Sequence, residues 1–286
     1  MTIAVSREPL PQPINDRREF LFTPVDFEQV RRLIHEHAGI SLSSAKQDMV
    51  YSRLSRRLRE RGLKSFGDYL ALLKRGDRAE WEKFVNSLTT NLTSFFRESH
   101  HFPILAAHLK KLQDKRSIRI WCCASSTGEE PYSIAMTVVE TFNSFNVPVS
   151  IFATDLDTGV LSAAASGVYA WDRVERLPRV RLIRFFSENQ DGTFSVRPEL
   201  RRLVTFQRLN LLEPNWSVRG PLDALFCRNI MIYFDRPTQH GILKRFAPLM
   251  DERGLLFAGH SESFLYASDL FRLQGKTVYE LARRAR

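Results

Sequence analysis

Residues 118–136, IRIWCCASSTGEEPYSIAM, constrain the fold more than any other stretch of this chain. The apolar residues at its start predict a short buried strand, and the small polar residues 125–128 predict a turn that ends the strand. Thr127 and Glu130 have the spacing of a capping box, and Pro131 suits the first turn of a helix. The stretch therefore predicts a strand, a turn and a helix in succession.

An acidic residue follows the next predicted strand. Residues 149–154 predict a second buried strand, and Asp155 comes directly after it. In a doubly wound sheet, ligands bind outside the carboxyl ends of adjacent strands, where a carboxylate can accept hydrogen bonds from ribose hydroxyls. The dinucleotide motif GxGxxG is absent, since Gly128 is the only glycine in the first turn. S-adenosylmethionine, which has a ribose but no phosphate, fits this pattern better, and an ordinary crossover without a ligand stays open.

Length and composition favour two domains. With 286 residues, 43% of them hydrophobic, the chain can bury a large core. No run approaches the roughly 18 apolar residues of a membrane span, and the first residues lack a signal-peptide pattern, so we expect a cytoplasmic protein without membrane insertion. Cys122, Cys123 and Cys227 fall in predicted buried strands, and the adjacent pair should face opposite sides. We expect reduced core thiols, with neither a disulfide framework nor a metal site.

The pattern of the chain changes near Asn91. Residues 1–22 are polar and contain prolines, which predicts a flexible tail. Residues 23–90 have apolar residues at three- and four-residue spacing, which predicts a small all-α domain. In residues 91–286, strands alternate with helices, as in a mostly parallel sheet. The helices predicted in the first domain are Thr23–Ala38, Ser43–Arg61, Phe66–Lys74 and Ala79–Thr89.

A small antiparallel insertion is predicted within the second domain, over about residues 167–208. The short strand-like pieces FSV and LVTFQ lie around the turn Asn189–Gly192, whose Asp-Gly pair favours a hairpin. The core strands predicted after the insertion are residues 222–230, 255–259 and 277–281. The expected fold class is therefore α/β, with a doubly wound sheet, a small β insertion and a preceding all-α domain.

A basic helix is predicted in the first domain. Residues 41–64 hold seven Lys and Arg against two acidic residues, which is half of the net charge of +10. Val50, Leu54 and Leu58 form an apolar stripe on this helix, with basic residues beside it. Such a helix can present an ordinary solvated face or a docking surface for an acidic partner, and the pattern alone leaves both open.

Five segments together resemble one known family. In order along the chain they are NLTSFFRESHHFPIL, STGEEPYSIA, ATDLDTGVL, FCRNIMIYFD and LLFAGHSESF. They are similar to the CheR family, the chemotaxis receptor methyltransferases, and the resemblance extends over about residues 24–281. It implies a Rossmann-like S-adenosylmethionine-dependent methyltransferase domain behind a helical receptor-docking domain. It also implies methyl transfer from S-adenosylmethionine to glutamate carboxylates of chemoreceptors, which gives glutamyl methyl esters and S-adenosylhomocysteine.

The resemblance also implies which residues form the site. Glu130, rather than Glu129, matches the ribose-binding carboxylate, because the family has that carboxylate second in the pair. Tyr233 matches the aromatic residue near the reacting methyl, and Arg97 and Tyr233 are the expected catalytic residues. The expected cofactor contacts are Asn91, Thr93, Arg97, Glu130, Asp155, Asn210, Leu211, Arg228 and Asn229.

The same resemblance gives the basic helix a partner, the acidic signalling helices of transmembrane chemoreceptors. Arg53, Arg56 and Arg57 are the expected docking residues. We expect a monomer. The hairpin loop Ser187–Thr193 is shorter and poorer in glycine than in family members that bind a receptor C-terminal pentapeptide, so an enzyme independent of that tether is expected.

Three other functions are weighed against this one. The charge and the fold also suit a nucleic-acid methyltransferase, but there is no N/D-P-P-Y/F motif, and Cys227 lacks the preceding proline of a cytosine C5 nucleophile, so we expect no nucleic-acid partner. A non-catalytic module that senses S-adenosylmethionine would not need Arg97 and Tyr233. An oxidoreductase is disfavoured because the glycine motif is absent.

Overall fold

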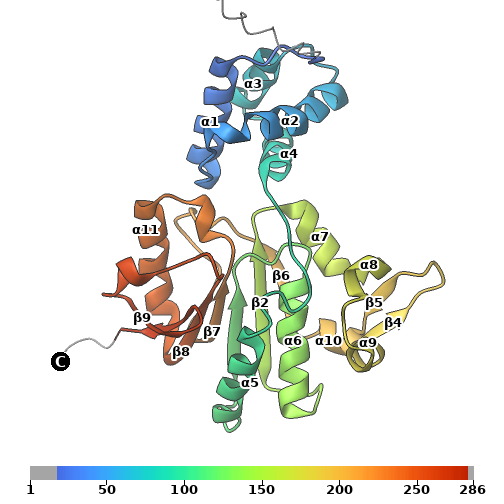
Figure 1. Ribbon diagram of the computed structural model, residues 1–286, viewed down its shortest axis with the longest axis vertical. Helices are drawn as coiled ribbons and strands as arrows, with labels where there is room; N and C mark the ends of the chain where they lie inside the picture. Colours follow the sequence, from blue (N-terminus) through green and yellow to red (C-terminus); the bar gives the residue numbers. More distant parts are fainter. Residues whose placement is uncertain (1–17, 283–286) are drawn as a thin grey trace, which may run out of the picture.

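The N-terminal part of the computed structural model, which describes residues 18–282, consists of four helices (Figure 1). Three of the helices begin at a residue whose side chain accepts a hydrogen bond from the first turn: Thr23, Ser65 and Asp77. The apolar faces of all four helices pack into one core. The helices are α1 (Pro24–Ala38), α2 (Gln47–Arg61), α3 (Phe66–Lys74) and α4 (Arg78–Leu88), and a short 3-10 turn, Ser44–Lys46, leads into α2.

This helical unit begins earlier than the sequence indicated. Phe20 and Phe22 are buried in its core, where the ring of Phe22 lies 4.3 Å from that of Phe66. The prediction of a flexible tail is therefore wrong for residues 18–22, since these aromatic rings cover the end of the helix bundle. The rest of that predicted tail, residues 1–17, lies outside the described residues.

A seven-stranded sheet forms the second part of the molecule, in the order β6-β2-β1-β7-β8-β10-β9. The first five strands in this order are parallel, and β10 and β9 are antiparallel to their neighbours. The parallel strands therefore end at one edge of the sheet. The strands are β1 (Ile118–Cys122), β2 (Val149–Asp155), β6 (Val204–Arg208), β7 (Leu222–Cys227), β8 (Met250–Ala258), β9 (Phe271–Gly275) and β10 (Val278–Leu281).

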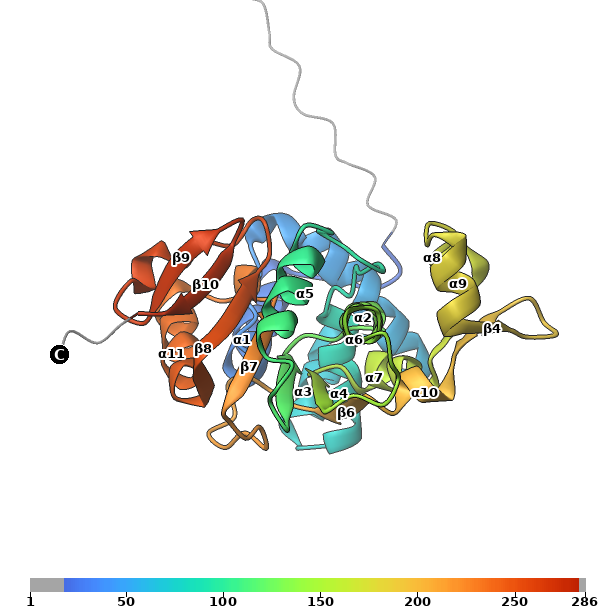
Figure 2. The same cartoon turned by 90° about the horizontal axis from the view of Figure 1, so that it is seen from below.

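Helices cover both faces of the sheet (Figures 1 and 2). On one face lie α5 (His101–Lys111) and α6 (Glu129–Phe142), and on the other lies α11 (Arg236–Phe246). Cys122 belongs to the first core, and Cys123 and Cys227 belong to the second, which confirms that the adjacent cysteines face opposite sides. All three cysteines are free, and burial raises the pKa of their thiols.

The β insertion is smaller than predicted. The strands β4 (Phe186–Glu188) and β5 (Phe194–Val196) form the expected hairpin, and β3 (Val168–Tyr169) adds a third strand beside β5. The piece LVTFQ, however, belongs to β6, which pairs in parallel with β2 at the edge of the large sheet, so its assignment to the insertion is wrong. The remaining helices of this region are α7 (Thr158–Ser166), α8 (Trp171–Val174), α9 (Arg179–Phe185) and α10 (Pro198–Arg201).

Within residues 18–282, no helix combines the length and the apolar character needed to cross a membrane.

Candidate active site

A pocket of about 410 Å³ lies where the carboxyl ends of the parallel strands meet the helical unit. Its walls come from the ends of β1, β2 and β7, from the linker after α4, and from Ile40, Leu42 and Met49 of the helical unit. All ten residues that the sequence analysis placed in the site line this one pocket. They are Asn91, Thr93, Arg97, Glu130, Asp155, Asn210, Leu211, Arg228, Asn229 and Tyr233.

The turn after β1 depends on Gly128. Its φ of 97° is left-handed, and a Cβ atom there would lie 2.8 Å from the Tyr169 hydroxyl oxygen, so only glycine fits without strain. Gly128 is the residue that precedes α6, and the helix has no side-chain cap. The predicted capping box is therefore wrong: Thr127 donates to Glu129 at 2.6 Å, and the Glu130 carboxylate contacts Arg228 instead.

Asp155 lies at the end of β2, in direct contact with this turn. Its carboxylate accepts hydrogen bonds from the backbone N–H groups of Ser126, at 2.8 Å, and Asp157, at 3.0 Å. Burial raises the pKa of Asp155 to about 6, against the lowering effect of these two bonds, and the nearby charge of Asp157 raises it further. The carboxylate is thus ionised at neutral pH but is poorly solvated, which favours binding of hydroxyl donors.

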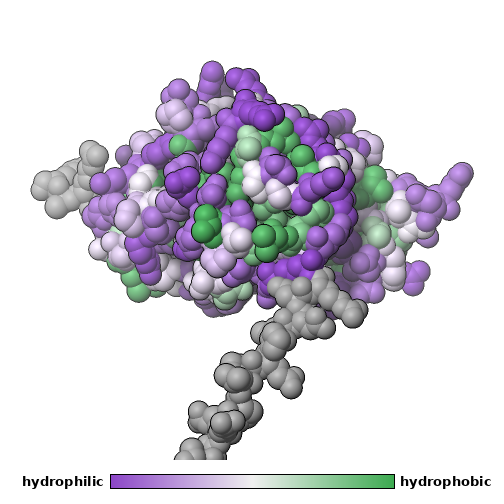
Figure 3. All heavy atoms as spheres, turned by 90° about the horizontal axis from the view of Figure 1, so that it is seen from above, coloured by the Kyte–Doolittle hydropathy of each residue, from purple (hydrophilic) through white to green (hydrophobic). Residues whose placement is uncertain are grey.

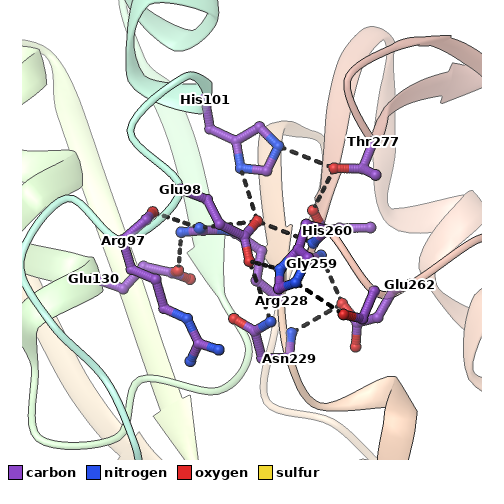
Figure 4. Close-up of polar contacts among 12 residues, drawn as sticks. Arg97, Glu98, His101, Glu130, Arg228, Asn229, Gly259, His260, Glu262 and Thr277 are labelled. Atoms are coloured by element: carbon purple, nitrogen blue, oxygen red, sulfur yellow. Dashed lines mark hydrogen bonds and ion pairs between the residues drawn. The ribbon is translucent and has the colours of Figure 1, made fainter.

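Arg228 is the cation at the base of the site (Figure 4). Its side chain is fully buried and forms ion pairs with Glu130 and, at 3.3 Å, with Glu98, and it donates to the Arg97 carbonyl at 2.5 Å. Burial acts to lower the pKa of Arg228, but the charges of Glu130 and Glu98 raise it above its usual value. The Nε atom of Arg228 is buried and has no hydrogen-bond partner among the described residues.

The structure distinguishes between the two adjacent glutamates. Glu130 lines the pocket beside Arg228, whereas Glu129 is fully buried and forms an ion pair with Arg173 of α8. Glu129 therefore contributes to the contact between α6 and the β insertion, and Glu130 is the one available to a ligand.

Two predicted cofactor contacts use their side-chain amides to join the two parts of the molecule. Asn91 donates to Asp157 at 2.8 Å, which fixes the linker against the start of α7. Asn210 donates to the His37 carbonyl at 2.8 Å, which fixes the loop after β6 against α1. Both residues line the pocket, but the amide nitrogen of each is already engaged.

The two predicted catalytic residues lie on the pocket wall. Arg97 is partly exposed and donates to the Leu92 carbonyl at 2.7 Å. Tyr233 ends a short 3-10 turn after β7, and its carbonyl accepts from the Ser41 N–H of the helical unit at 2.8 Å. The helical unit is therefore in direct contact with the segment that carries Tyr233.

The three predicted docking residues have different surroundings. Arg57 is buried and pairs with Glu80 and Glu60, so its assignment as a docking residue is wrong: its guanidinium cannot reach a partner. Arg53 donates to the Thr89 carbonyl at 2.6 Å and is partly buried. Of the three, only Arg56 is exposed, and it pairs with Glu60 at 2.9 Å. Seen from above, hydrophilic side chains surround a central hydrophobic area on the outer face of the helical unit (Figure 3).

Two carboxylates that the sequence analysis did not assign lie next to the site. Glu98 contacts Arg228, Asn229 and His260, and Glu262 accepts four backbone N–H bonds from the turns after β7 and β8 (Figure 4). Both glutamates lie in segments that carry the family resemblance, NLTSFFRESHHFPIL and LLFAGHSESF. The signal in the sequence was an acidic residue within such a segment. His260, which follows the end of β8, has its imidazole Nδ1 3.0 Å from the Glu98 carboxylate.

Comparisons with known proteins identify the family. Residues 91–279 match the model described as "CheR methyltransferase, SAM binding domain", and residues 25–89 match "CheR methyltransferase, all-alpha domain". A chemotaxis protein methyltransferase 2 of Pseudomonas aeruginosa is 52% identical over 276 residues, 95% of this chain and 98% of that protein. The chemotaxis protein methyltransferase of Escherichia coli K12 is 49% identical over 261 residues, 90% of this chain and 91% of that protein.

A solved structure, PKMT2 from Rickettsia typhi in complex with AdoHcy, is a far more distant match. It is 13% identical with a TM-score of 0.37, over 59% of this chain and 26% of that one, which is too remote to inform the site.

Proposed function

The chain belongs to the CheR methyltransferase family, and on that premise we propose that it methylates glutamate side chains of chemoreceptors. It is an S-adenosylmethionine-dependent methyltransferase of chemotaxis, and the proposal concerns the acceptor group and the residues that act on it. The observation that carries the proposal is the single pocket in which all ten predicted site residues meet, between the sheet and the helical unit.

The residues present fit S-adenosylmethionine. The Asp155 carboxylate can accept from ribose hydroxyls, and apolar residues beside it, such as Leu156 and Leu211, offer a surface for the adenine. The unpaired Nε of Arg228 and the carboxylate of Glu130 offer a donor and an acceptor for the polar amino-acid end. When bound, the cofactor supplies an electrophilic methyl on a sulfonium.

Methyl transfer to a carboxylate asks the protein mainly for positioning. A glutamate with a pKa near 4.3 is already ionised at pH 7, so the acceptor needs no general base. The pocket walls must hold the acceptor oxygen about 3 Å from the methyl, and they must keep water out, because the two reacting charges are lost in the transition state. We assign Arg97 to orienting the acceptor or the cofactor, and Tyr233 to shaping the methyl's approach.

The acceptor is expected to dock on the basic side of the helical unit. Arg56 on α2 and Lys46 at the pocket wall are exposed cations there, and the acidic signalling helices of receptors are the complementary partner. The short turn between β4 and β5 supports action without a C-terminal receptor tether. We also propose that the enzyme works as a monomer.

Transfer of labelled methyl from S-adenosylmethionine to receptor-containing membranes tests the proposal. Label should enter the receptor and leave as methanol under mild alkali, which hydrolyses carboxyl methyl esters. A receptor lacking its last five residues should be labelled at the same rate. Label that resists alkali, or appears in nucleic acid, would contradict glutamate as the acceptor, and a slower truncated receptor would contradict the absence of tethering.

Arg97→Ala is expected to lower kcat/KM for receptor methylation about 10- to 100-fold. The reason is that an arginine that orients a carboxylate supplies a charge-assisted hydrogen bond of about 1.5–3 kcal/mol. Arg116→Ala, an exposed arginine just before β1, is the matched control and should retain full activity. Full activity together with unchanged cofactor affinity in Arg97→Ala would remove Arg97 from the mechanism.

Cofactor affinity is expected to fall as the pH drops below about 6. The pKa of Asp155 is raised to about 6, so its carboxylate becomes protonated below that pH and can no longer accept two hydroxyl donors. Titration calorimetry with S-adenosylhomocysteine should show affinity that is flat above pH 7 and about tenfold weaker at pH 5. Asp155→Asn should bind weakly at both pH values. An affinity of wild-type protein that does not change between pH 5 and 7 would contradict this role.

A further inference from the structure

Two carboxylates from other parts of the chain, those of Glu98 and Glu262, hold the segment that carries Arg228 and Asn229 (Figure 4). Glu98 lies just before α5, and Glu262 lies in the turn after β8. Neither of them lines the pocket. Both therefore act on the site through other residues rather than on a ligand directly.

Glu262 holds the main chain of this segment. Its buried carboxylate accepts from the N–H groups of Asn229 at 2.9 Å, Ile230 at 3.0 Å and Met231 at 2.8 Å, and from Gly259 at 2.6 Å. A Cβ atom at Gly259 would lie 2.5 Å from the Asn229 side-chain nitrogen, which shows how closely the two turns approach. The backbone after β7 is thus fixed without any help from Glu98.

Glu98 holds the side chains instead. Its carboxylate lies 3.3 Å from the Arg228 guanidinium and accepts from the Asn229 amide at 3.3 Å. From the other side it accepts from the His260 N–H at 3.1 Å and contacts the imidazole at 3.0 Å. Burial acts to raise the pKa of Glu98, but the bond to His260 and the charge of Arg228 lower it to about 2, so the carboxylate stays ionised at every physiological pH.

The backbone around Glu98 is strained. Glu98 has a φ of 52°, and Phe96 and Asn229 have φ of 53° and 59°, although none of the three is glycine. Left-handed conformations of such residues cost on the order of 1–3 kcal/mol each, so they persist only where the surroundings enforce them. Three of the seven non-glycine residues with positive φ in the described part of the chain therefore lie in the two segments that the Glu98 carboxylate joins.

We propose that Glu98 is a positioning residue of the methyltransferase, which sets the side chains of Arg228 and Asn229 for binding S-adenosylmethionine. The inference rests on the proposed cofactor contacts of those two residues. Arg228 carries two carboxylate partners, Glu98 and Glu130, of which only Glu130 lines the pocket. The Glu98 carboxylate fixes the guanidinium of Arg228. Glu130 and the unpaired Nε of Arg228 therefore keep the orientation in which they can bind a ligand.

A metal site is the rival interpretation of this cluster. Glu98, His100 and His101 place three ligand atoms within 4.8 Å of one another, and the buried Nδ1 of His101 has no hydrogen-bond partner among the described residues. A cation there would lie beside the Arg228 guanidinium, which already pairs with Glu98 and repels positive charge. The positive charge of Arg228 therefore disfavours a metal ion at this cluster and favours the positioning role of Glu98.

Cofactor affinity of Glu98 variants, measured without receptor, tests the proposal. Glu98→Gln keeps the shape of the side chain and removes its charge. It should weaken S-adenosylhomocysteine binding about tenfold, because the loss of a hydrogen bond to a charged group lowers an equilibrium constant by about that factor. Glu98→Ala should weaken binding about 30-fold or more. In receptor methylation, KM for S-adenosylmethionine should rise by the same factors, with kcat and KM for receptor within threefold of wild type.

Two matched variants separate positioning from general stability. Glu252→Gln, an exposed glutamate at the opposite end of β8, should change nothing. Glu262→Gln should lower Tm by several degrees, because it loosens the main chain, and Glu98→Gln should lower it as well, because it removes one partner of the buried Arg228 ion pair. Affinity measured well below both Tm values keeps the loss of binding apart from the loss of stability.

A double-mutant cycle shows whether Glu98 acts through Arg228. In an Arg228→Met background, Glu98→Gln should add less than a threefold further loss of affinity, because, of the two groups that Glu98 positions, only the Asn229 amide remains. Glu98→Gln that binds within twofold of wild type, or a loss that multiplies fully in the Arg228→Met background, would overturn the inference. If Glu98→Ala does not fold, the near-isosteric Glu98→Gln decides. Wild-type protein that binds the cofactor but does not label receptors would contradict only the proposed acceptor.

Discussion

Asp155→Asn is expected to weaken S-adenosylmethionine affinity about 100-fold or more at pH 8 while leaving the free energy of unfolding unchanged or higher. Two charge-assisted hydrogen bonds to ribose hydroxyls are worth about 1.5–3 kcal/mol each, which accounts for a loss of that size. The stability effect has the opposite sign, because the pKa of Asp155 is raised from 3.8 to about 6 in the folded protein.

The direction follows from proton linkage. A carboxyl group with a raised folded pKa contributes stability below its unfolded pKa, and that contribution is lost as the pH rises through about 6. At pH 8 the ionised, poorly solvated Asp155 therefore costs the fold on the order of 2–3 kcal/mol, which asparagine does not incur. Asparagine loses one of the two backbone bonds, because its NH2 group cannot accept from Ser126 or Asp157, and this offsets part of the gain. The buried Asp155 carboxylate thus lowers the stability of the fold, but it is poorly hydrated and can accept hydrogen bonds from a ligand.

Calorimetry with S-adenosylhomocysteine and denaturant unfolding at pH 8 measure the two effects on the same protein. Asp172→Asn, which neutralises an exposed carboxylate on α8, is the control and should change neither quantity. Asp155→Asn that binds within tenfold of wild type would remove Asp155 from the ribose contact. A loss of more than about 2 kcal/mol in unfolding free energy would contradict the linkage argument.

The sequence was sufficient to predict the features that depend on short, regular patterns. The helix Phe66–Lys74 has the predicted bounds, and β2 follows its apolar run to Asp155. The carboxyl ends of parallel strands meet at one edge, so residues that follow β1, β2 and β7 had to converge on one place. That geometric rule, applied to residues named from the family resemblance, explains why seven of the ten line one pocket. The other three, Asn91, Thr93 and Arg97, come from the segment between α4 and α5, which the rule does not place.

The errors concern partners distant in sequence. The piece LVTFQ has a strand pattern wherever it pairs, and only the tertiary structure places it beside β2 rather than in the insertion. Thr127 has the right spacing for a cap, but Arg228, which is 98 residues after Glu130, takes the carboxylate that the cap would need. Local spacing gives the type of an element and does not give the neighbour that satisfies its polar groups.

The mistaken role of Arg57 has the same origin, and a signal for it was present. Glu80, Phe84 and Leu88 recur at four-residue spacing and lie on the buried face of α4. An acid on the apolar face of a helix needs a buried cation, and α2 is rich in arginine. Arg57 meets this need with bonds of 2.9 to 3.0 Å to the Glu80 carboxylate, so it belongs to the core of the helical unit.

Glu80→Ala is expected to destabilise the helical unit by about 3–5 kcal/mol. Removing the buried partner of an ion pair is costly, and here it leaves the buried Arg57 with only the partly exposed Glu60 as a counter-charge and the Tyr69 hydroxyl without its acceptor at 3.0 Å. Denaturant unfolding should show an early transition for the helices ahead of the sheet. The control Glu82→Ala, on the exposed side of the same helix, should cost less than about 0.5 kcal/mol.

A double substitution separates the charge from the packing. Arg57→Met with Glu80→Leu removes both charges and retains apolar volume, and it should recover most of the stability that Glu80→Ala loses. Because Ile40, Leu42 and Met49 of the same unit wall the pocket, Glu80→Ala should also weaken cofactor affinity, and the double variant should restore it. A double variant as unstable as Glu80→Ala would show that the ion pair specifies the packing of these helices and does not merely fill their core.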